Sequence, residues 1–172
     1  VNDFLAFAQP RRFELESVSL NGILEEELQR CETIARTAGV RIERALDAAL
    51  GPVEVDPHRL RQALTNLLQN AIEAMPTGGT LSVRSSRANA QGFVHVEIED
   101  SGVGFAEDAP LFDAFYTTKS GGTGLGLSIA HKIVSEHGGI LRAEPRNPGA
   151  CFFVLLPQLH KSSVLDAARN DD

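Results

Sequence analysis

Residues 121–137, GGTGLGLSIAHKIVSEH, place glycines at positions 122, 124 and 126 directly before a segment that we expect to form a helix. Glycine near a helix start costs about 1 kcal/mol relative to alanine, so its repeated use there needs a reason. Backbone N–H groups at a helix N-terminus bind phosphate well when no side chain is in the way. A flexible linker is the alternative, although Leu125 and Leu127 are atypical of one. The segment therefore predicts a phosphate-binding helix start.

Helix and strand signals alternate through the rest of the chain. Ser19 and Asp56-Pro57 are expected to cap two long helices, the first with apolar residues from Leu20 to Ile34 on one face and a stop at Gly39. Strands are expected at residues 13–18, 41–46, 53–55, 80–86, 93–100, 140–143 and 151–156, and a long loop at 102–122. Hairpin-length connections join several strands. We therefore expect an α/β two-layer sandwich, with one mixed, mostly antiparallel sheet and helices on one face, rather than a doubly wound sheet.

Composition excludes several classes of function. The net charge of −7, without a block of Lys or Arg, argues against nucleic acid or an anionic membrane surface as the main partner. Cys31 and Cys151 stand apart from any metal-binding pattern, which excludes a zinc site and leaves a disulfide open. No apolar run approaches the ~18 residues of a membrane span, and Val1-Asn2-Asp3 lacks a basic leader. We expect a reduced, cytoplasmic chain that makes no membrane contact, although its parent protein can be membrane-anchored.

Asn66 and Asn70 lie four residues apart in the sequence LTNLLQNAIEAM, so both amides fall on one face of the predicted helix. They flank Leu67 and Leu68, which belong to its buried side. Two solvated surface residues are one interpretation. The other is a site for Mg²⁺, which takes hard oxygen ligands such as an amide oxygen and completes its shell with phosphates and water.

Asp100 ends a strand in which Val94, Val96 and Ile98 alternate with polar residues. It shares the parity of the apolar residues and should therefore point inward, which is costly unless a group donates to it. Asp100-Ser101-Gly102 can simply cap a turn. Alternatively, the carboxylate accepts from a ligand amino group such as that of adenine, with glycines beside it that let a flat ring approach the backbone.

These segments, in this order, resemble the ATP-binding catalytic domain of sensor histidine kinases, which shares the Bergerat fold with gyrase, Hsp90 and MutL. The family motifs are matched as follows: the N box at 66–75, the first glycine box at 100–104, the F box at 112–119, the second glycine box at 122–127 and the closing strand at 149–157. The resemblance implies the end of a dimerisation helix at 1–10, the ATP-binding catalytic domain at 11–159 and a polar tail at 160–172.

The resemblance also implies a site for ATP and Mg²⁺. Asn70 would hold Mg²⁺, Asp100 would bind adenine, and the loop between the glycine boxes would be the ATP lid. Asn66 is the implied catalytic residue. Relatives that hydrolyse ATP have a glutamate at this position, which activates water. Because an amide is no general base, ATP would be held for transfer and hydrolysed slowly. The implied ATP contacts are Asn66, Asn70, Glu73, Asp100, Gly102, Gly104, Phe115, Thr118, Lys119, Gly122, Thr123, Gly124, Leu125, Gly126 and Leu127.

As a protein histidine kinase, the chain would transfer the γ-phosphate to a histidine on its own dimerisation domain, form a homodimer in the full-length protein and serve a response regulator. None of its five histidines is followed by an acidic residue, so the acceptor is expected outside this chain. Three positions depart from the family pattern: Glu73 stands where many members have a basic residue, Ala114 where the F box has proline, and Cys151 where threonine is common. The alternatives are a nucleotide-binding module without transfer activity and an anti-sigma serine kinase, which Val1–Pro10 disfavours.

Overall fold

The computed structural model describes residues 13–88, 92–119 and 121–158. The helix expected at 1–10 and the polar tail at 160–172 lie outside these residues. Within them, a five-stranded sheet has the order β2-β4-β5-β7-β6. Its strands are β2 (Val40–Leu46), β4 (Gly79–Arg87), β5 (Phe93–Asp100), β6 (Ile140–Pro145) and β7 (Ala150–Pro157). β2 and β4 are parallel and every other pair is antiparallel.

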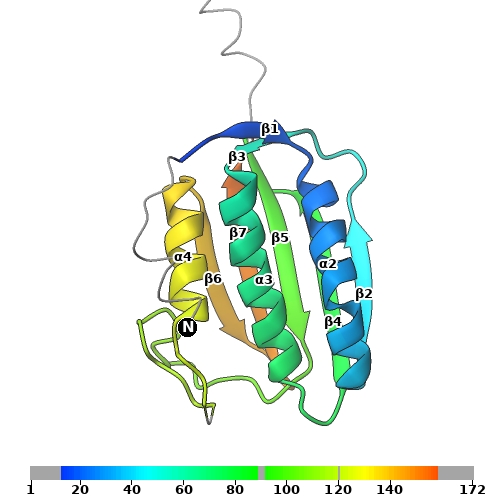
Figure 1. Cartoon of the computed structure of the whole chain (residues 1–172), viewed down its shortest axis with the longest axis vertical. Helices are drawn as coiled ribbons and strands as arrows, with labels where there is room; N and C mark the ends of the chain where they lie inside the picture. The colour runs from blue at the N-terminus through cyan, green and yellow to red at the C-terminus, as the bar shows by residue number, and fades with distance from the viewer. Residues whose placement is uncertain (1–12, 89–91, 120, 159–172) are drawn as a thin grey trace, which may run out of the picture.

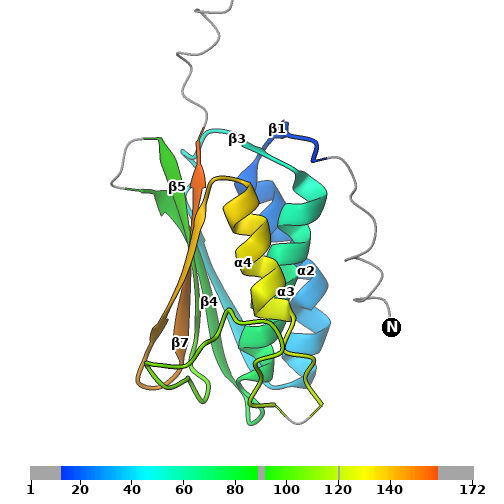
Figure 2. The same ribbon diagram turned by 90° about the vertical axis from the view of Figure 1, so that its left-hand side faces the viewer.

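Three helices lie side by side on one face of this sheet (Figure 1). They are α2 (Leu20–Thr37), α3 (Pro57–Glu73) and α4 (Gly126–Glu136). In the view turned by 90°, the helices form one layer and the sheet forms the other (Figure 2). The predicted two-layer sandwich with a mixed, mostly antiparallel sheet is confirmed.

Two of the predicted strands form a separate two-stranded ribbon and do not belong to the main sheet. β1 (Glu16–Val18) pairs antiparallel with β3 (Val53–Val55), apart from the main sheet. β1 begins three residues later than the strand expected at 13–18, because β3 offers only three partner residues. Phe13 instead packs against the His137 ring, with the ring centroids 4.8 Å apart.

The predicted caps fix where the helices begin. The Ser19 hydroxyl accepts a hydrogen bond from the Gly22 N–H, and the Asp56 carboxylate accepts one from the Arg59 N–H at 3.0 Å. These bonds satisfy N–H groups that have no partner within the helix. One prediction about α2 is wrong: Ile34 is 52% exposed and Ala35 is buried in its place. The buried stripe continues from Cys31 by a step of four residues, which a helix face allows as readily as three.

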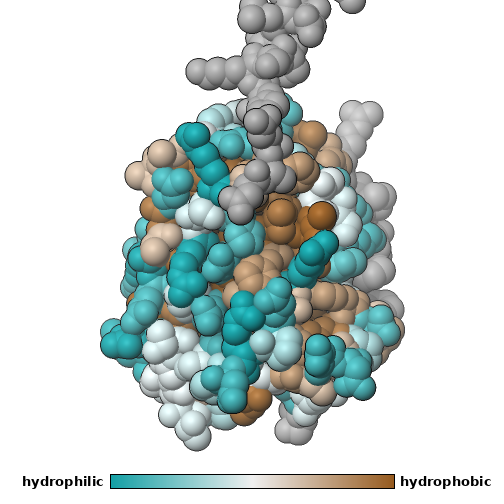
Figure 3. All heavy atoms as spheres, turned by 180° about the vertical axis from the view of Figure 1, so that it is seen from behind, coloured by the Kyte–Doolittle hydropathy of each residue, from teal (hydrophilic) through white to brown (hydrophobic). Residues whose placement is uncertain are grey.

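The hydrophobic core lies between the helices and the sheet, where Leu24, Leu67 and Ile98 are fully buried. None of the helices in the described residues lies on the opposite face of the sheet, and hydrophilic side chains cover much of that face (Figure 3). On β4 and β5, Arg84 there contacts Glu97 and Glu99 at 3.1 and 3.3 Å. No helix in the described part of the chain has both the length and the apolar character needed to cross a membrane.

Candidate functional site

A cavity of about 530 Å³ lies between α3, the end of β5 and the start of α4, under the long loop that joins β5 to α4. Its volume falls in the range of small-molecule binding sites, roughly 300–1,000 Å³. The described residues of the loop between Ser101 and Leu125 form neither helix nor strand, as predicted. The loop lies at the end of the molecule where α4 begins (Figure 2).

The cavity brings together segments that are far apart in the sequence, and most of the expected contact residues line it. Those that do are Asn66, Asn70, Glu73, Asp100, Gly104, Thr118, Lys119, Gly122, Thr123, Gly124, Leu125, Gly126 and Leu127. Gly102 and Phe115 lie outside its lining. Cys151 does not line it either: strand alternation assigns its side chain to the sheet face opposite Phe152, and burial raises the pKa of its thiol to about 12.

Asp100 forms a buried polar end of the cavity. Its side chain is turned inward, as the strand parity predicted, and the residue is 2% exposed. Oδ1 accepts a hydrogen bond from the Gly102 N–H at 2.9 Å, whereas Oδ2 has no hydrogen-bond partner among the described residues. Burial raises the pKa of Asp100 above its ordinary value, whereas the backbone N–H groups of Gly102 and Ala150 and the positive charge of Lys119 oppose that shift. A buried carboxylate oxygen facing a cavity without a donor suits a ligand N–H group.

Gly102 supports Asp100 rather than lining the cavity itself. A Cβ at this position would lie 2.3 Å from the Ala74 carbonyl oxygen at the end of α3. Only glycine therefore allows the chain to cross the end of α3 and still donate its N–H to Asp100. Beside them, the aromatic side chains of Phe105 and Phe152 contribute an apolar wall to the cavity.

The polar side of α3 forms a second wall. Gln62, Asn66, Gln69, Asn70 and Glu73 all line the cavity, at the spacing of one helix face. The Asn66 Nδ2 atom donates to the carbonyl oxygen of Gly126 at 3.1 Å, which connects the middle of α3 to the first residue of α4. The two asparagines therefore lie on one face, as their spacing predicted.

Three groups meet at the far end of that face. The Lys119 Nζ atom, from the loop, donates to Asn70 Oδ1 at 2.8 Å and to Glu73 Oε2 at 2.8 Å. Both acceptors are hard oxygens of the kind that Mg²⁺ prefers, and the cation between them indicates that they suit a positive charge. No group of three His, Cys, Asp or Glu side chains that could hold a metal occurs in the described ranges. A Mg²⁺ ion here would therefore draw its other ligands from phosphates and water.

The start of α4 provides the third wall. α4 begins at Gly126, and none of the described side chains caps the N–H groups of its first turn. Those groups carry partial positive charge beside the cavity, as the phosphate-binding prediction requires. Gly124, with φ +67°, precedes them; a Cβ there would lie 2.3 Å from the Phe115 carbonyl carbon. The Phe115 N–H donates to the Gly124 carbonyl at 2.9 Å, so the middle of the long loop is tied to its end.

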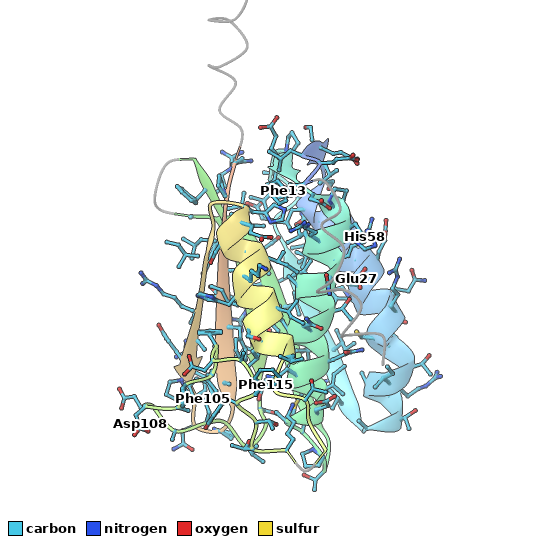
Figure 4. The ribbon with its side chains drawn as sticks, turned by 60° about the vertical axis from the view of Figure 1, so that its left-hand side comes forward. Phe13, Glu27, His58, Phe105, Asp108 and Phe115 are labelled. Atoms are coloured by element: carbon cyan, nitrogen blue, oxygen red, sulfur yellow. The ribbon has the colours of Figure 1, made fainter. Side chains whose placement is uncertain are left out.

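Phe115 itself is 74% exposed and has φ 70°, which is unusual for a bulky side chain. Figure 4 shows it beside the end of α3 and the start of α4, at the opposite end of the molecule from Phe13.

Several lining residues were absent from the sequence-based set. Gln62 and Gln69 could have been found by extending the helical spacing of Asn66 and Asn70. Apolar members such as Phe105, Ile129 and Phe152 carry no such signal, because an apolar residue beside a ligand has the same pattern as one in the core.

Comparison with known proteins agrees with this geometry. Residues 55–160 match the family model of the histidine kinase-, DNA gyrase B- and HSP90-like ATPases. The sensor histidine kinase ZraS of Escherichia coli K12 is 35% identical over 160 residues, covering 91% of this chain and 34% of that protein. The chain thus spans about a third of this curated relative.

Solved structures give the same result. The nucleotide-free catalytic domain of histidine kinase ThkA has a TM-score of 0.76 and 35% identity, with 84% of this chain and 98% of that domain covered. Full-length ShkA in complex with AMPPNP has a TM-score of 0.80 and 31% identity, covering 91% of this chain and 34% of that one. ThkA in complex with the response regulator protein TrrA has a TM-score of 0.78 and 31% identity, covering 92% and 46%.

A family model that covers most of the chain and a solved catalytic domain that aligns over nearly its whole length agree on one assignment. The chain belongs to the histidine kinase-, DNA gyrase B- and HSP90-like ATPases, and within them it is a catalytic ATPase domain of the sensor histidine kinases.

Proposed function

We propose that this domain binds Mg-ATP in the cavity and transfers its γ-phosphoryl group to a histidine on a dimerisation domain outside this chain. The proposed contacts are the predicted residues, with Gly102 acting through Asp100 and Phe115 through the lid backbone. The unpaired Oδ2 of the buried Asp100 carries the nucleotide assignment. An adenine amino group would supply the missing donor, while guanine offers a carbonyl oxygen at that edge and would repel the carboxylate.

The phosphate end of the site is proposed at the start of α4. The uncapped N–H groups beyond Leu125 and the Lys119 ammonium group both line the cavity. Asn70, with Glu73 beside it, would hold Mg²⁺, and the ion would supply charge neutralisation on the phosphates. These groups favour transfer because phosphoryl chemistry depends mainly on positioning and on stabilising charge.

The reaction itself requires a nucleophile from the partner domain. A neutral imidazole nitrogen would attack the γ-phosphorus as the bond to the β,γ-bridging oxygen breaks, releasing ADP. The phosphorylated ring would then lose the proton on its other nitrogen to solvent. Asn66 lines the cavity and donates to Gly126, and its amide cannot take a proton from water. Slow hydrolysis and retention of ATP for transfer are therefore proposed.

The described histidines do not suit the role of acceptor. His137 is buried, and its Nε2 atom accepts from the Asp56 N–H at 2.9 Å. His131 stacks on Phe112 at 4.9 Å between ring centroids. His58 and His95 lie on α3 and β5, outside the cavity lining. We infer that the acceptor, the homodimer contacts and the docking of a response regulator involve parts of the parent protein beyond this domain.

The test is incubation with γ-labelled ATP and Mg²⁺, with and without a separately produced dimerisation domain of the parent protein. We expect no acid-labile label on this chain and slow labelling of the dimerisation domain, because docking becomes bimolecular. Acid-labile label on this chain alone would contradict the placement of the acceptor. Binding of ATP without label on either partner would favour a nucleotide-binding module that lacks transfer activity.

A further inference from the structure

The structure assigns a second role to Lys119, which we propose acts as a tethered cation. In the nucleotide-free domain its ammonium group takes the place of the metal ion between Asn70 and Glu73, and Mg²⁺ must displace it to enter. This inference rests on the proposed function, because it concerns the same site and the same metal.

The contacts of the ammonium group carry the argument. Lys119 Nζ donates to Asn70 Oδ1 at 2.8 Å, to Glu73 Oε2 at 2.8 Å and more weakly to the Asn70 carbonyl oxygen at 3.4 Å. An ammonium group has three donors and no acceptor, so these three oxygens use its full capacity. The amide oxygen proposed as the Mg²⁺ ligand is therefore already occupied by a positive charge from the chain itself.

The backbone around Lys119 forms a turn that holds it in place. Its N–H donates to the Thr117 hydroxyl at 3.1 Å, and its carbonyl accepts from the Gly122 N–H at 3.2 Å. A Cβ on Gly122 would lie 2.6 Å from the Thr117 Oγ1 atom, so a larger residue there would displace the hydroxyl that accepts from Lys119. The ammonium group thus ties this turn of the lid to α3, across 49 residues of sequence from Asn70.

The contact of Lys119 with Asn70 and Glu73, which we call the latch, depends on the acidic residue at position 73. The negative charge at this position attracts the lid lysine, whereas a basic residue there would repel it. The pair is partly exposed, with 35% of the Lys119 side chain and 61% of the Glu73 side chain accessible. An exposed ion pair of this kind shifts an equilibrium by roughly two- to fivefold, which suits a latch that must open whenever the ligand binds. Metal entry would then be coupled to release of the lid.

The first test uses the nucleotide-free domain and needs no activity. Tyr116 lines the cavity three residues before Lys119 and is the single tyrosine of a chain without tryptophan, so its fluorescence anisotropy reports on the lid. We expect Lys119→Met and Glu73→Gln each to lower the anisotropy, and the double variant to lower it no further, because both remove one contact. Arg84→Met, on the opposite face of the sheet, is the matched control. Unchanged anisotropy in both single variants would overturn the latch.

The second test measures the Mg²⁺ concentration at half-saturation for binding of ADP, which leaves the γ-phosphate out of the comparison. With ADP in excess, Lys119→Met should need roughly two- to fivefold less Mg²⁺ than the wild type, since the competing cation is gone. Glu73→Gln should not lower the midpoint, because it removes an oxygen charge that favours the metal as well. A Lys119→Met midpoint equal to or above that of the wild type would refute the competition. Wild-type protein that binds no ADP at any Mg²⁺ concentration would instead overturn the proposed function, and this proposal with it.

Discussion

The Asn66 amide donates a hydrogen bond to the Gly126 carbonyl at 3.1 Å, and this contact connects the predicted N box to the first residue of α4. The two residues are 60 positions apart in the chain. The contact holds the uncapped N–H groups of α4 in a fixed place relative to the oxygens of α3. The phosphate end and the metal end of the proposed site are therefore both fixed to α3 and α4. The loop that joins β5 to α4, in contrast, is irregular.

Changing Asn66→Asp should lower the affinity for Mg-ATP by at least about tenfold. The carboxylate cannot donate to Gly126, and its charge competes with phosphate for the N–H groups of α4. Isothermal titration calorimetry measures the effect. Gln29→Glu makes the same change from amide to acid at an exposed position of α2 and should leave the affinity unaltered. Equal affinities in the two variants would show that Asn66 does not belong to the phosphate end.

Asp100→Asn should make the free domain more stable relative to the wild type as the pH rises. Burial raises the pKa of Asp100 in the folded state. The carboxyl therefore favours folding fully below the ordinary aspartate pKa of about 4, and this contribution is lost as the pH rises through the raised folded value. Asparagine does not titrate, so the difference in unfolding free energy, variant minus wild type, should increase from about pH 4 to pH 7.

Urea unfolding at several pH values in this range gives that difference. Asp108→Asn alters an exposed loop carboxylate and serves as the control. A difference for Asp100→Asn that stays constant or shrinks with pH would contradict a buried carboxylate whose pKa is raised.

Gly124→Ala should impair nucleotide binding by more than tenfold while the core remains folded. Its Cβ would lie 2.3 Å from the Phe115 carbonyl carbon, so the segments at Phe115 and Gly124 must separate. Gly121→Ala provides a close comparison, because Gly121 also has a positive φ, +84°, but its Cβ would meet nothing within 4 Å. That variant should lose only what the backbone strain costs, about 1 kcal/mol, which is roughly fivefold in affinity. Similar losses in both variants would mean that strain, rather than the Phe115 contact, controls the lid.

Local signals in the sequence were sufficient to place the elements and much of the site. Ser19 and Asp56-Pro57 are capping residues, so they set helix starts without help from the rest of the fold. The alternation along β5 was enough to predict that Asp100 points inward, because successive side chains of a strand point to opposite faces. Helical spacing placed Asn66 and Asn70 on one side.

What the sequence could not supply depends on contacts between distant segments. The strand 13–18 was shortened by the length of its partner β3, which no local pattern reveals. Lys119 was expected near phosphates, yet its bonds to Asn70 and Glu73 depend on how the loop folds back over α3. Phe115 was expected at the nucleotide, but the bond from its N–H to Gly124 is accompanied by a side chain turned to solvent.

The central claim, that the buried Asp100 selects adenine, is tested most directly by calorimetric titration of the wild-type domain with Mg-ATP and with Mg-GTP. The Asp100 Oδ2 atom lacks a donor, and the amino group of adenine supplies one where guanine presents an oxygen. We predict binding of Mg-ATP and at least about 100-fold weaker binding of Mg-GTP, since a buried unpaired charge costs several kcal/mol. Equal affinities for the two nucleotides would contradict the claim.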